Sequence, residues 1–464
     1  MNPSRRVLRF ALGALLALAA CDDSSHPEPV AAVEAVLGSL SVEPVAATLV
    51  VGSTVPITQQ TPDPAANARA RILVVSRDPA GTPLFGRRLR FTSSAPGVAE
   101  VSDSGVVRAV APGTARITIA SGTFTAELRV TVERPYTLTY LGTLPGAEQS
   151  RATSINELGQ VVGYTAGASG NVQRAFFWES GRMTALTFPD TLGMVYSADA
   201  VAVNEAGQVA GTLYTSTGYY VYLWRSGAST LARISALISP YQGSGVARAL
   251  NDRGEIVGSW RADFCTRNCP GGGFVVRGGQ AVGLSNYGKL RIEPAGINNA
   301  GQIAGTLYTG GAGTESGQAF FLESERAPLT LLPTSQVASG AGGIDEQGRV
   351  VGTDLVLSGT VRPFFWSPGG APTYLGVLRS GSASRATRAN AQGVAIGSSD
   401  CFGCTALVPV LFRGAEVVRV NDLFVAGDWS FDAVTDINDR GQVVGYGKNR
   451  TTGATGALLL TPAP

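Results

Sequence analysis

Two closely spaced cysteine pairs are the side chains of this chain whose type and spacing could do chemistry. Three residues separate Cys265 from Cys269, and two separate Cys401 from Cys404. Thiols at such spacings form local disulfides, join in a set of four to bind zinc, or exchange disulfides with a substrate. Which chemistry applies depends on how far apart the fold holds the two pairs.

Acid–base chemistry has few candidates. The only histidine is His26, close to the N-terminus, so a serine–histidine–aspartate triad, an HExxH zinc site and a histidine general base have no candidate in the folded part. A glycosidase or lyase needs two opposed carboxylates. The recurring acids lie mostly at turn positions, where acidic residues are common, and none is evidently opposed by a second. They are Glu157, Glu205, Asp252, Glu346 and Asp439. We therefore predict no catalytic residue, no metal site and no cofactor.

These acids belong to a nine-residue phrase that occurs seven times. The first copy is INELGQVVG (155–163), the last is INDRGQVVG (437–445), and successive copies start 45 to 48 residues apart. An apolar residue, Asn or Asp, two variable residues and Gly predict a four-residue hairpin turn, because Asn or Asp caps its own backbone and Gly accepts a positive φ. The turn residues are Asn156 and Gly159, Asn204 and Gly207, Asn251 and Gly254, Asn298 and Gly301, Asp345 and Gly348, Asn390 and Gly393, and Asn438 and Gly441.

Each copy predicts four strands. The first precedes the turn, the second follows it and carries a glycine that leaves room for close backbone approach, the third is aromatic as in AFFW (175–178), and the fourth is like PTYLGVL (372–378). Repeats of this kind are typical of a β-propeller. The last copy ends after its third strand, whereas YTLTYLGTL (136–144) before the first copy matches the fourth-strand segment. We predict a seven-bladed propeller over 135–464, closed by this N-terminal strand.

The predicted seven-bladed ring determines how far apart the two cysteine pairs lie. The two pairs fall in copies three and six, nearly opposite each other, which is too far apart to share a zinc ion with bonds of about 2.3 Å to sulfur. We therefore predict that Cys265 with Cys269, and Cys401 with Cys404, form local disulfides that fasten loops after the second strand. Redox activity at the second pair stays open, although no thioredoxin-like βαβ pattern surrounds it.

The longer connections define the candidate binding surface. If the two tight turns of each copy lie on one face of the propeller, the longer connections, including residues 262–273, lie on the other. Aromatic residues near that face could stack on sugars or anchor a protein, although packing between blades explains them at least as well. They are Tyr164, Tyr214, Tyr219, Tyr220, Trp260, Tyr308 and Tyr446.

Amino-acid composition indicates the fold class and argues against one class of partner. The 464 residues are 44% hydrophobic and 15% charged, with 59 glycines and 25 prolines, which predicts an all-β protein of at least two folding units. A net charge of +2 gives no support to a surface that follows phosphates, so we expect no nucleic-acid partner.

The N-terminus predicts export. Arginines at 5, 6 and 9 precede an apolar run over 10–20 that is too short to span a bilayer, so residues 1–20 are expected to be a signal peptide. The signal ends in LALAAC, which resembles the lipobox of bacterial lipoproteins. The resemblance implies that Cys21 is lipidated and holds the mature chain to a membrane of the bacterial cell envelope, periplasmic or surface-exposed. An ordinary cleaved signal is the alternative. The polar, proline-bearing residues 21–36 are expected to be a tether.

Residues 37–134 predict a β-sandwich. Alternating stretches such as ARITIA (115–120) and AELRVTV (126–132) lie between short turns. The run over 91–132 resembles the bacterial Ig-like domain of group 2, with Phe91 where that family usually has tryptophan. Such modules are usually stalks, so we expect a spacer more than a binder, since a fold does not by itself give a function.

The repeats also resemble a known family. YLGTLPGAEQSRATSINELGQVVGYT and RAFFWESGRMTAL are similar to the HAF repeat of predicted extracellular bacterial proteins, with Arg174 in place of the consensus histidine. The resemblance implies an exported propeller-type protein and assigns no role to individual residues. We thus predict an envelope lipoprotein whose Ig-like stalk presents a propeller for ligand binding or adhesion, with a glycan or a protein as ligand. A polysaccharide hydrolase or lyase that uses propeller carboxylates is the alternative.

Overall fold

Short alternating strands at the start of the described chain form a β-sandwich. The computed structural model describes residues 36–167, 172–226, 228–233, 243–262, 271–284, 291–309, 316–335, 337–379, 381–402, 404–425 and 427–464. One sheet has the order β1 (Ser39–Glu43), β4 (Ile72–Arg77), β3 (Thr54–Gln59), β8 (Val106–Ala109) and β7 (Ala99–Val101), with β5 (Pro83–Leu84) beside β4. The other has the order β2 (Ala46–Val50), β10 (Phe124–Glu133), β9 (Gly113–Ser121) and β6 (Arg90–Ser93).

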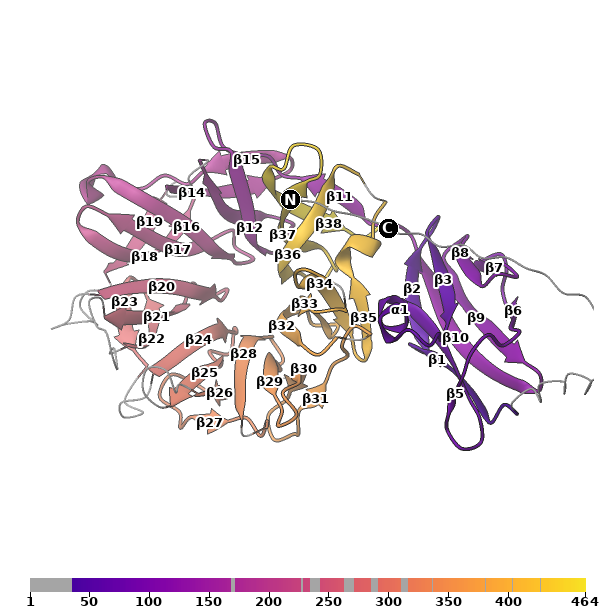
Figure 1. Cartoon of the computed structure of the whole chain (residues 1–464). Helices are drawn as coiled ribbons and strands as arrows, with labels where there is room; N and C mark the ends of the chain where they lie inside the picture. Colours follow the sequence, from indigo (N-terminus) through magenta and orange to yellow (C-terminus); the bar gives the residue numbers. More distant parts are fainter. Residues whose placement is uncertain are drawn as a thin grey trace, which may run out of the picture.

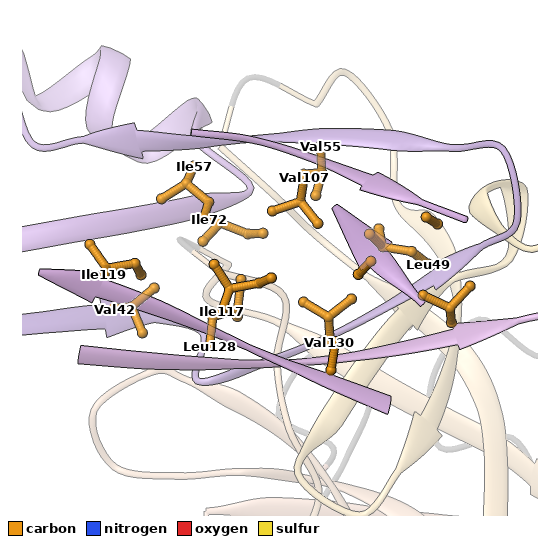
Figure 2. Packing of buried hydrophobic residues seen from close by; sticks show 14 of the residues in the cluster. Val42, Leu49, Val55, Ile57, Ile72, Val107, Ile117, Ile119, Leu128 and Val130 are labelled. Carbon is orange, nitrogen blue, oxygen red and sulfur yellow. The ribbon is translucent and has the colours of Figure 1, made fainter. Parts of the chain in front are cut away.

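The core of the sandwich lies between these two sheets. Every second residue of β9 points inward, so Ile117 and Ile119 meet Val107 and Ile57 of the other sheet, as Figure 2 shows. The connection between β3 and β4 contains the helix α1 (Pro64–Arg69). Asp63 caps this helix, because its carboxylate accepts a hydrogen bond of 2.8 Å from the backbone N–H of Ala65.

The remainder of the described chain forms seven four-stranded antiparallel sheets arranged in a ring, as Figure 1 shows. The predicted fold, an Ig-like sandwich followed by a seven-bladed propeller, is confirmed. Blades 1 to 3 are β12 (Gln149–Ile155), β13 (Val161–Ala166), β14 (Gln173–Glu179) and β15 (Arg182–Ala185); β16 (Val195–Val203), β17 (Val209–Thr215), β18 (Gly218–Arg225) and β19 (Ala228–Arg233); and β20 (Gly243–Leu250), β21 (Ile256–Ala262), β22 (Gly271–Arg277) and β23 (Gln280–Gly283).

Blades 4 to 6 repeat the same order. They are β24 (Arg291–Ile297), β25 (Ile303–Thr309), β26 (Ser316–Leu322) and β27 (Thr330–Leu331); β28 (Ala338–Ile344), β29 (Val350–Leu355), β30 (Val361–Trp366) and β31 (Thr373–Tyr374); and β32 (Ser384–Ala389), β33 (Val394–Ser399), β34 (Val408–Arg413) and β35 (Glu416–Arg419). Two short 3-10 helices, η1 (Asp190–Leu192) and η2 (Val420–Asp422), lie in connections.

Blade 7 closes the ring with a strand from the other end of the propeller. It consists of β36 (Trp429–Ile437), β37 (Val443–Asn449), β38 (Thr455–Thr461) and β11 (Thr137–Tyr140). β11 pairs antiparallel with β38, with Leu138 opposite Leu460, and the ring of Tyr140 stacks on Trp429 with 4.4 Å between ring centroids. The closing strand predicted from the sequence is therefore confirmed. Its pairing with β38 covers the edge that the last strand of the chain would otherwise expose.

The glycine of each second strand makes room for the core of its blade. Gly163 of β13 is paired with Phe176 of β14, and Gly211 of β17 is paired with Tyr222 of β18 in the same register. A Cβ atom on Gly163 would collide with the carbonyl oxygen of Arg151 and lie 2.9 Å from the ring of Phe176, which is fully buried. The glycine and the aromatic residue of the third strand are thus one packing unit.

The Ig-like domain packs against the outer edge of blade 6 and the connection that follows it, as Figure 1 shows. The guanidinium of Arg413 donates hydrogen bonds of 2.5 and 3.2 Å to the carboxylate of Glu133, and Thr48 of β2 donates one of 2.5 Å to Glu416 of β35. Arg71 pairs with Asp422 at 2.6 Å. These contacts join the two domains at several points beyond the connecting chain.

Among the residues that the structure describes, no helix has the length and apolar character needed to cross a bilayer. The residues predicted to form the signal and most of the tether, including Cys21, lie outside the described part.

Candidate functional site

The strand order separates the two faces of the propeller. Because each blade is an antiparallel meander, the turn between its first and second strands and the turn between its third and fourth strands lie at the same end. We call this end the turn face. The connections between second and third strands, and those between blades, lie at the opposite end, which we call the loop face.

The turn face is held by a circle of asparagine amides. In blade 3, the Oδ1 atom of Asn251 accepts a hydrogen bond of 3.0 Å from the N–H of Glu255 and so closes its own turn. Its Nδ2 atom donates a bond of 3.0 Å to the carbonyl oxygen of Asn298 in blade 4. The same donation runs from Asn156 to Asn204, Asn204 to Asn251, Asn298 to Asp345, Asn390 to Asn438, and Asn438 to Asn156. Each repeat therefore ties its blade to the next.

The residue after the turn glycine completes this arrangement. In blade 1 the Nδ2 atom of Asn156 also donates to the side-chain oxygen of Gln160, at 2.7 Å, and Gln208, Gln302 and Gln442 accept in the same way. All six asparagines are at most 5% exposed. Each turn glycine has a positive φ, between 70° at Gly207 and 86° at Gly301.

Blade 5 is joined to blade 6 by an ion pair in place of the asparagine amide. Asp345 cannot donate a side-chain hydrogen bond to blade 6. Instead Arg349, which stands where most copies have Gln or Glu, pairs with the carboxylate of Asp345 at 2.6 Å. The same guanidinium donates bonds of 3.3 and 2.9 Å to the carbonyl oxygens of Asn390 and Ala391 in blade 6. The circle thus passes through Arg349 where the asparagine is missing.

The recurring acids make a second set of contacts between neighbouring turns on the turn face. Glu205 accepts a hydrogen bond of 2.9 Å from the backbone N–H of Glu157, and Asp252 accepts one of 2.9 Å from the N–H of Glu205. Glu346, Asp439 and Glu157 accept in the same way from Asn299, Ala391 and Asp439. Each of these carboxylates therefore caps the turn of a neighbouring blade. The sequence predicts that the acids lie in turns, and the structure adds this stabilising contact.

Burial and crowding affect the protonation of two of these acids. Burial raises the pKa of Glu205, the bond from the Glu157 N–H lowers it, and the charges of Asp252 and Glu157 raise it, with a net upward shift. The pKa of Glu346 is raised for the same reasons, with Asn299 as the hydrogen-bond donor. Within the residues that the structure describes, no cluster of three or more acids, cysteines or histidines has the geometry to hold a metal ion.

The loop face carries an exposed aromatic cluster on blade 2. Tyr214 of β17 and Tyr219 of β18 are directly paired, and their rings stack at 4.6 Å with 20° between planes. Tyr196 lies at a bulge of β16 and approaches Tyr214 at 5.1 Å. We call these three residues the tyrosine ladder. Tyr196 and Tyr214 are each 41% exposed, and the adjacent Met194 is 67% exposed.

The ladder lies on the side of blade 2 that faces blade 3. Ala210 of β17 packs in one cluster with Ile256 and Trp260 of β21, and Thr212 accepts a hydrogen bond of 3.1 Å from the N–H of Ala247. Side chains two and four residues apart on a strand share one face, so Tyr214 points to the same side. Trp260 thus belongs to the opposing side of the same seam, as a half-buried residue.

The other predicted aromatic residues do not join the ladder. Arg151 covers the ring of Tyr446 at 4.2 Å, and Arg291 covers Tyr308 at the same distance. Tyr220 packs against the opposite side of β18, and its hydroxyl meets that of Thr217 at 3.1 Å. Tyr164 is half-buried on β13. Tyr446, Tyr308 and Tyr220 thus have contacts within or between blades that do not involve the tyrosine ladder.

Sequence reasoning missed two aromatic features of this face. Tyr196 was not a candidate, although the apolar run over 194–196 in an expected loop-face connection is a signal for it. The stacked pair of Tyr140 and Trp429 was also missed, because its members come from opposite ends of the propeller sequence. Tyr140 is 42% exposed.

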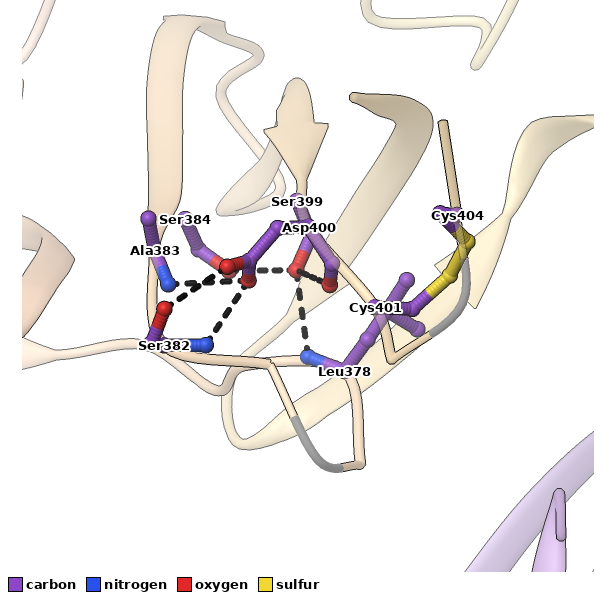
Figure 3. The surroundings of a disulfide bond; sticks show 8 residues. All are labelled: Leu378, Ser382, Ala383, Ser384, Ser399, Asp400, Cys401 and Cys404. Carbon is purple, nitrogen blue, oxygen red and sulfur yellow. Dashed lines mark hydrogen bonds between the residues drawn. A yellow bond between two sulfur atoms is a disulfide. The ribbon is translucent and has the colours of Figure 1, made fainter. Parts of the chain in front are cut away.

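The disulfide lies on the loop face of blade 6. Cys401 and Cys404 are bonded, with Cα atoms 5.4 Å apart, directly after β33. Figure 3 shows Asp400 next to it, where one carboxylate oxygen accepts bonds of 2.8 Å from the N–H groups of Ser382 and Ala383. The segment before β32 and the disulfide loop are therefore fastened together. Cys265 and Cys269 lie outside the described residues.

Comparison with known proteins concerns the first domain and the fold. The family model of the bacterial Ig-like domain matches residues 87–134. No curated protein sequence matches the chain significantly. Among solved structures, a puromycin hydrolase is 13% identical over 68% of this chain and 55% of that chain, with a TM-score of 0.46. TolB from Acinetobacter baumannii is 9% identical over 92% of this chain and 96% of that chain, with a TM-score of 0.33.

A fungal lectin is similar at the same level. The six-bladed β-propeller lectin of Aleuria aurantia is 9% identical over 69% of this chain and 98% of that chain, with a TM-score of 0.30. This chain spans about half the length of the hydrolase that it matches. The protein is thus an all-β chain in which a sandwich containing a bacterial Ig-like segment precedes a closed seven-bladed propeller.

Proposed function

We propose that the chain is a lipid-anchored protein of the bacterial cell envelope whose propeller, built from HAF-type repeats, binds a glycan at its loop face. The tyrosine ladder on blade 2 carries this proposal. Its rings come from three neighbouring strands and lie one beside another, with Tyr196 and Tyr214 each 41% exposed. Exposed aromatic surface of this kind is characteristic of a binding site.

The chemistry of the ladder suits a sugar chain. The negative face of an aromatic ring attracts the polarised C–H groups of a sugar, and several rings in line suit an extended chain of sugar units. Tyrosine also offers a hydroxyl that can meet the hydroxyls of the ligand, at low cost in side-chain entropy. The half-buried Trp260 of blade 3 provides a second apolar surface across the seam.

Binding is favoured over hydrolysis by the placement of the carboxylates. The acids that an enzyme would draw on, such as Glu205 and Asp252, accept backbone hydrogen bonds on the turn face, at the end opposite to the ladder. Hydrolysis needs two carboxylates on either side of the scissile bond. No specific observation favours the enzymatic alternative, so we propose a binding module.

A glycan array probed with the full chain in detergent, followed by calorimetry with the glycan that binds most strongly, tests the proposal. Tyr214→Ala and Tyr196→Ala are expected to weaken binding at least tenfold, because each removes a contact ring. Phe85→Ala is the matched control, since Phe85 is 42% exposed on the Ig-like domain. Release of shortened glycan products, or binding that Tyr214→Ala leaves unchanged, would overturn the proposal.

The anchor is tested separately. Labelling of cells with an alkyne-bearing fatty acid is expected to mark the wild-type chain and not Cys21→Ser, which should leave the membrane fraction because the acyl chains supply the anchoring energy. A Cys21→Ser chain that remains on the membrane would contradict the anchor without affecting the glycan proposal.

A further inference from the structure

A cavity lies between the Ig-like domain and blade 6. Its volume is about 220 Å³, and it is lined by β2 and residues 68–72 of the sandwich, and by β35, residues 377–379 and residues 401–402 of the propeller. The ion pair of Arg71 with Asp422, at 2.6 Å, forms part of its wall. Both domains therefore contribute to the lining of this cavity, which is open to solvent on one side.

Arginine side chains dominate the polar part of this cavity. Arg379 is committed to the end of α1, because its guanidinium donates to the carbonyl oxygens of Asn67 and Ala70, the latter at 2.9 Å. Arg71 is committed to Asp422. Arg419 is half-buried, and within the part of the chain that the structure describes its guanidinium has no hydrogen bond or ion pair. Among the described residues of this wall, Arg419 is thus a half-buried arginine whose guanidinium is not neutralised by a direct contact, and Arg69, which also lacks a partner, is exposed.

Partial burial disfavours the charged form of the Arg419 guanidinium. Burial lowers the pKa of Arg419, the charge of Asp422 offsets this in part, and the charge of Arg71 lowers the pKa further. A half-buried guanidinium has a strong preference for a carboxylate or phosphate, which it binds with two parallel hydrogen bonds. The lining contains four arginines and two acids, Glu416 and Asp422, so the positive charges outnumber the negative ones.

The wall also carries partly exposed apolar side chains, while its acid Glu416 accepts a hydrogen bond from Thr48. Phe402, in the disulfide loop, is 46% exposed, Val45 beside β2 is 71% exposed, and Val377 is 37% exposed. These three side chains come from both domains. A ligand of purely ionic character would leave this surface uncovered, whereas an anion with a short apolar chain would cover it.

We propose that this cavity binds a small organic oxyanion, a carboxylate or a phosphate on a short apolar chain, with the charge at Arg419 and the chain against Phe402, Val377 and Val45. Because the ligand touches both domains, it fixes the Ig-like domain on blade 6 and raises the stability of the docked form. The site is separate from the tyrosine ladder and does not depend on a glycan ligand.

Calorimetry with the full chain and four probes tests this site. Hexanoate and hexyl phosphate carry both features, acetate lacks the chain, and hexanol lacks the charge. We expect saturable binding of hexanoate or hexyl phosphate, at least tenfold weaker binding of acetate, and none of hexanol. Comparison of the two hexyl anions identifies which oxyanion is preferred.

Variants assign the binding to Arg419. Arg419→Gln is expected to weaken the preferred anion at least tenfold, and Arg419→Lys less, because lysine keeps the charge and loses the paired geometry. Arg116→Gln is the control, since Arg116 is an exposed arginine of the sandwich whose ion pair with Glu127 spans 3.9 Å. Should Arg419→Gln fail to fold, the probe series on the wild type still decides. The proposal fails if no anion binds, if hexanol binds as tightly as hexanoate, or if a folded Arg419→Gln chain binds unchanged.

Discussion

The turn face and the loop face of the propeller come from one repeat and use their side chains in opposite ways. On the turn face, the amides of asparagines such as Asn251 and the carboxylates of acids such as Glu205 are bonded to the backbone of neighbouring turns. On the loop face, Tyr196 and Tyr214 present their rings to solvent. One end of the ring holds the blades together, which leaves the other end free to vary. The following substitutions test this contrast.

Gly163→Ala is expected to have the largest effect. The added methyl group would collide with the carbonyl oxygen of Arg151 and press on the buried ring of Phe176, so we expect a loss of about 3 kcal/mol or more in the free energy of unfolding. Urea denaturation measures it. Gly283→Ala is the control, because a Cβ there meets nothing within 4 Å. Equal losses at the two glycines would contradict the packing unit of glycine and aromatic residue.

Asn251→Ala tests the circle of amides. It removes the bond to the Asn298 carbonyl and the bonds that close its own turn, and it leaves buried polar groups without partners, for a loss of about 3 kcal/mol. Asn251→Asp keeps the acceptor of the turn, but it places a buried carboxylate against that of Glu255, to which the amide donates at 2.7 Å, so its loss should be at least as large. Denaturation midpoints of the two variants give the comparison. A loss below about 1 kcal/mol for Asn251→Ala would show that the circle contributes little.

Blade 5 allows the circle to be rebuilt. Arg349→Ala leaves the Asp345 side chain, which is 6% exposed, without its cation and removes the bond to Ala391, so we expect a loss of about 2 kcal/mol. The double variant Asp345→Asn with Arg349→Gln restores the pair of side chains found in most other blades. Its free energy of unfolding should therefore return most of the way to that of the wild type. A double-mutant cycle in urea measures the coupling. If the rebuilt chain is as unstable as Arg349→Ala, the equivalence of the two arrangements is wrong.

Glu205→Gln is expected to have the smallest effect, and it depends on pH. The folded-state pKa of Glu205 is raised, so its contribution to stability is fully present below the unfolded value of about 4.3 and is lost as pH rises through the folded value. Glutamine keeps the acceptor for the Glu157 N–H and lacks this loss. The variant should therefore gain on the wild type between about pH 4 and pH 7, by a fraction of a kcal/mol because the group is well exposed. A gain that shrinks over this range would reverse the sign.

Much of the fold could be predicted because the repeat is regular along the chain. The recurrence of Asn or Asp, Gly and a second Gly gives the turns, and the likeness of the segment around Thr137–Tyr140 to a fourth strand gives the closure. The contacts between blades could not be predicted in this way. The repeat pattern describes the residues within one blade, but it does not show which carbonyl group of the next blade an asparagine amide contacts. The recurring Gln160, Gln208, Gln302 and Gln442 were a visible signal of them.

The site was harder to predict for a related reason. Tyr214 and Tyr219 flank a hairpin, and their pairing follows from the turn between them. Tyr196 joins them only because a bulge in β16 turns its side chain to the same face, and a bulge leaves no trace in the pattern of apolar residues. The docking of the Ig-like domain depends on pairs such as Arg413 with Glu133, 280 residues apart in the chain.

The division between the two faces is tested most directly by titrating the strongest array glycan into Tyr214→Ala and Asn251→Ala side by side, with the free energy of unfolding measured for both. We predict that Tyr214→Ala loses at least tenfold in affinity while its stability stays within about 1 kcal/mol of the wild type, and that folded Asn251→Ala binds normally but is less stable. Normal binding by Tyr214→Ala, or lost binding by folded Asn251→Ala, would contradict the account.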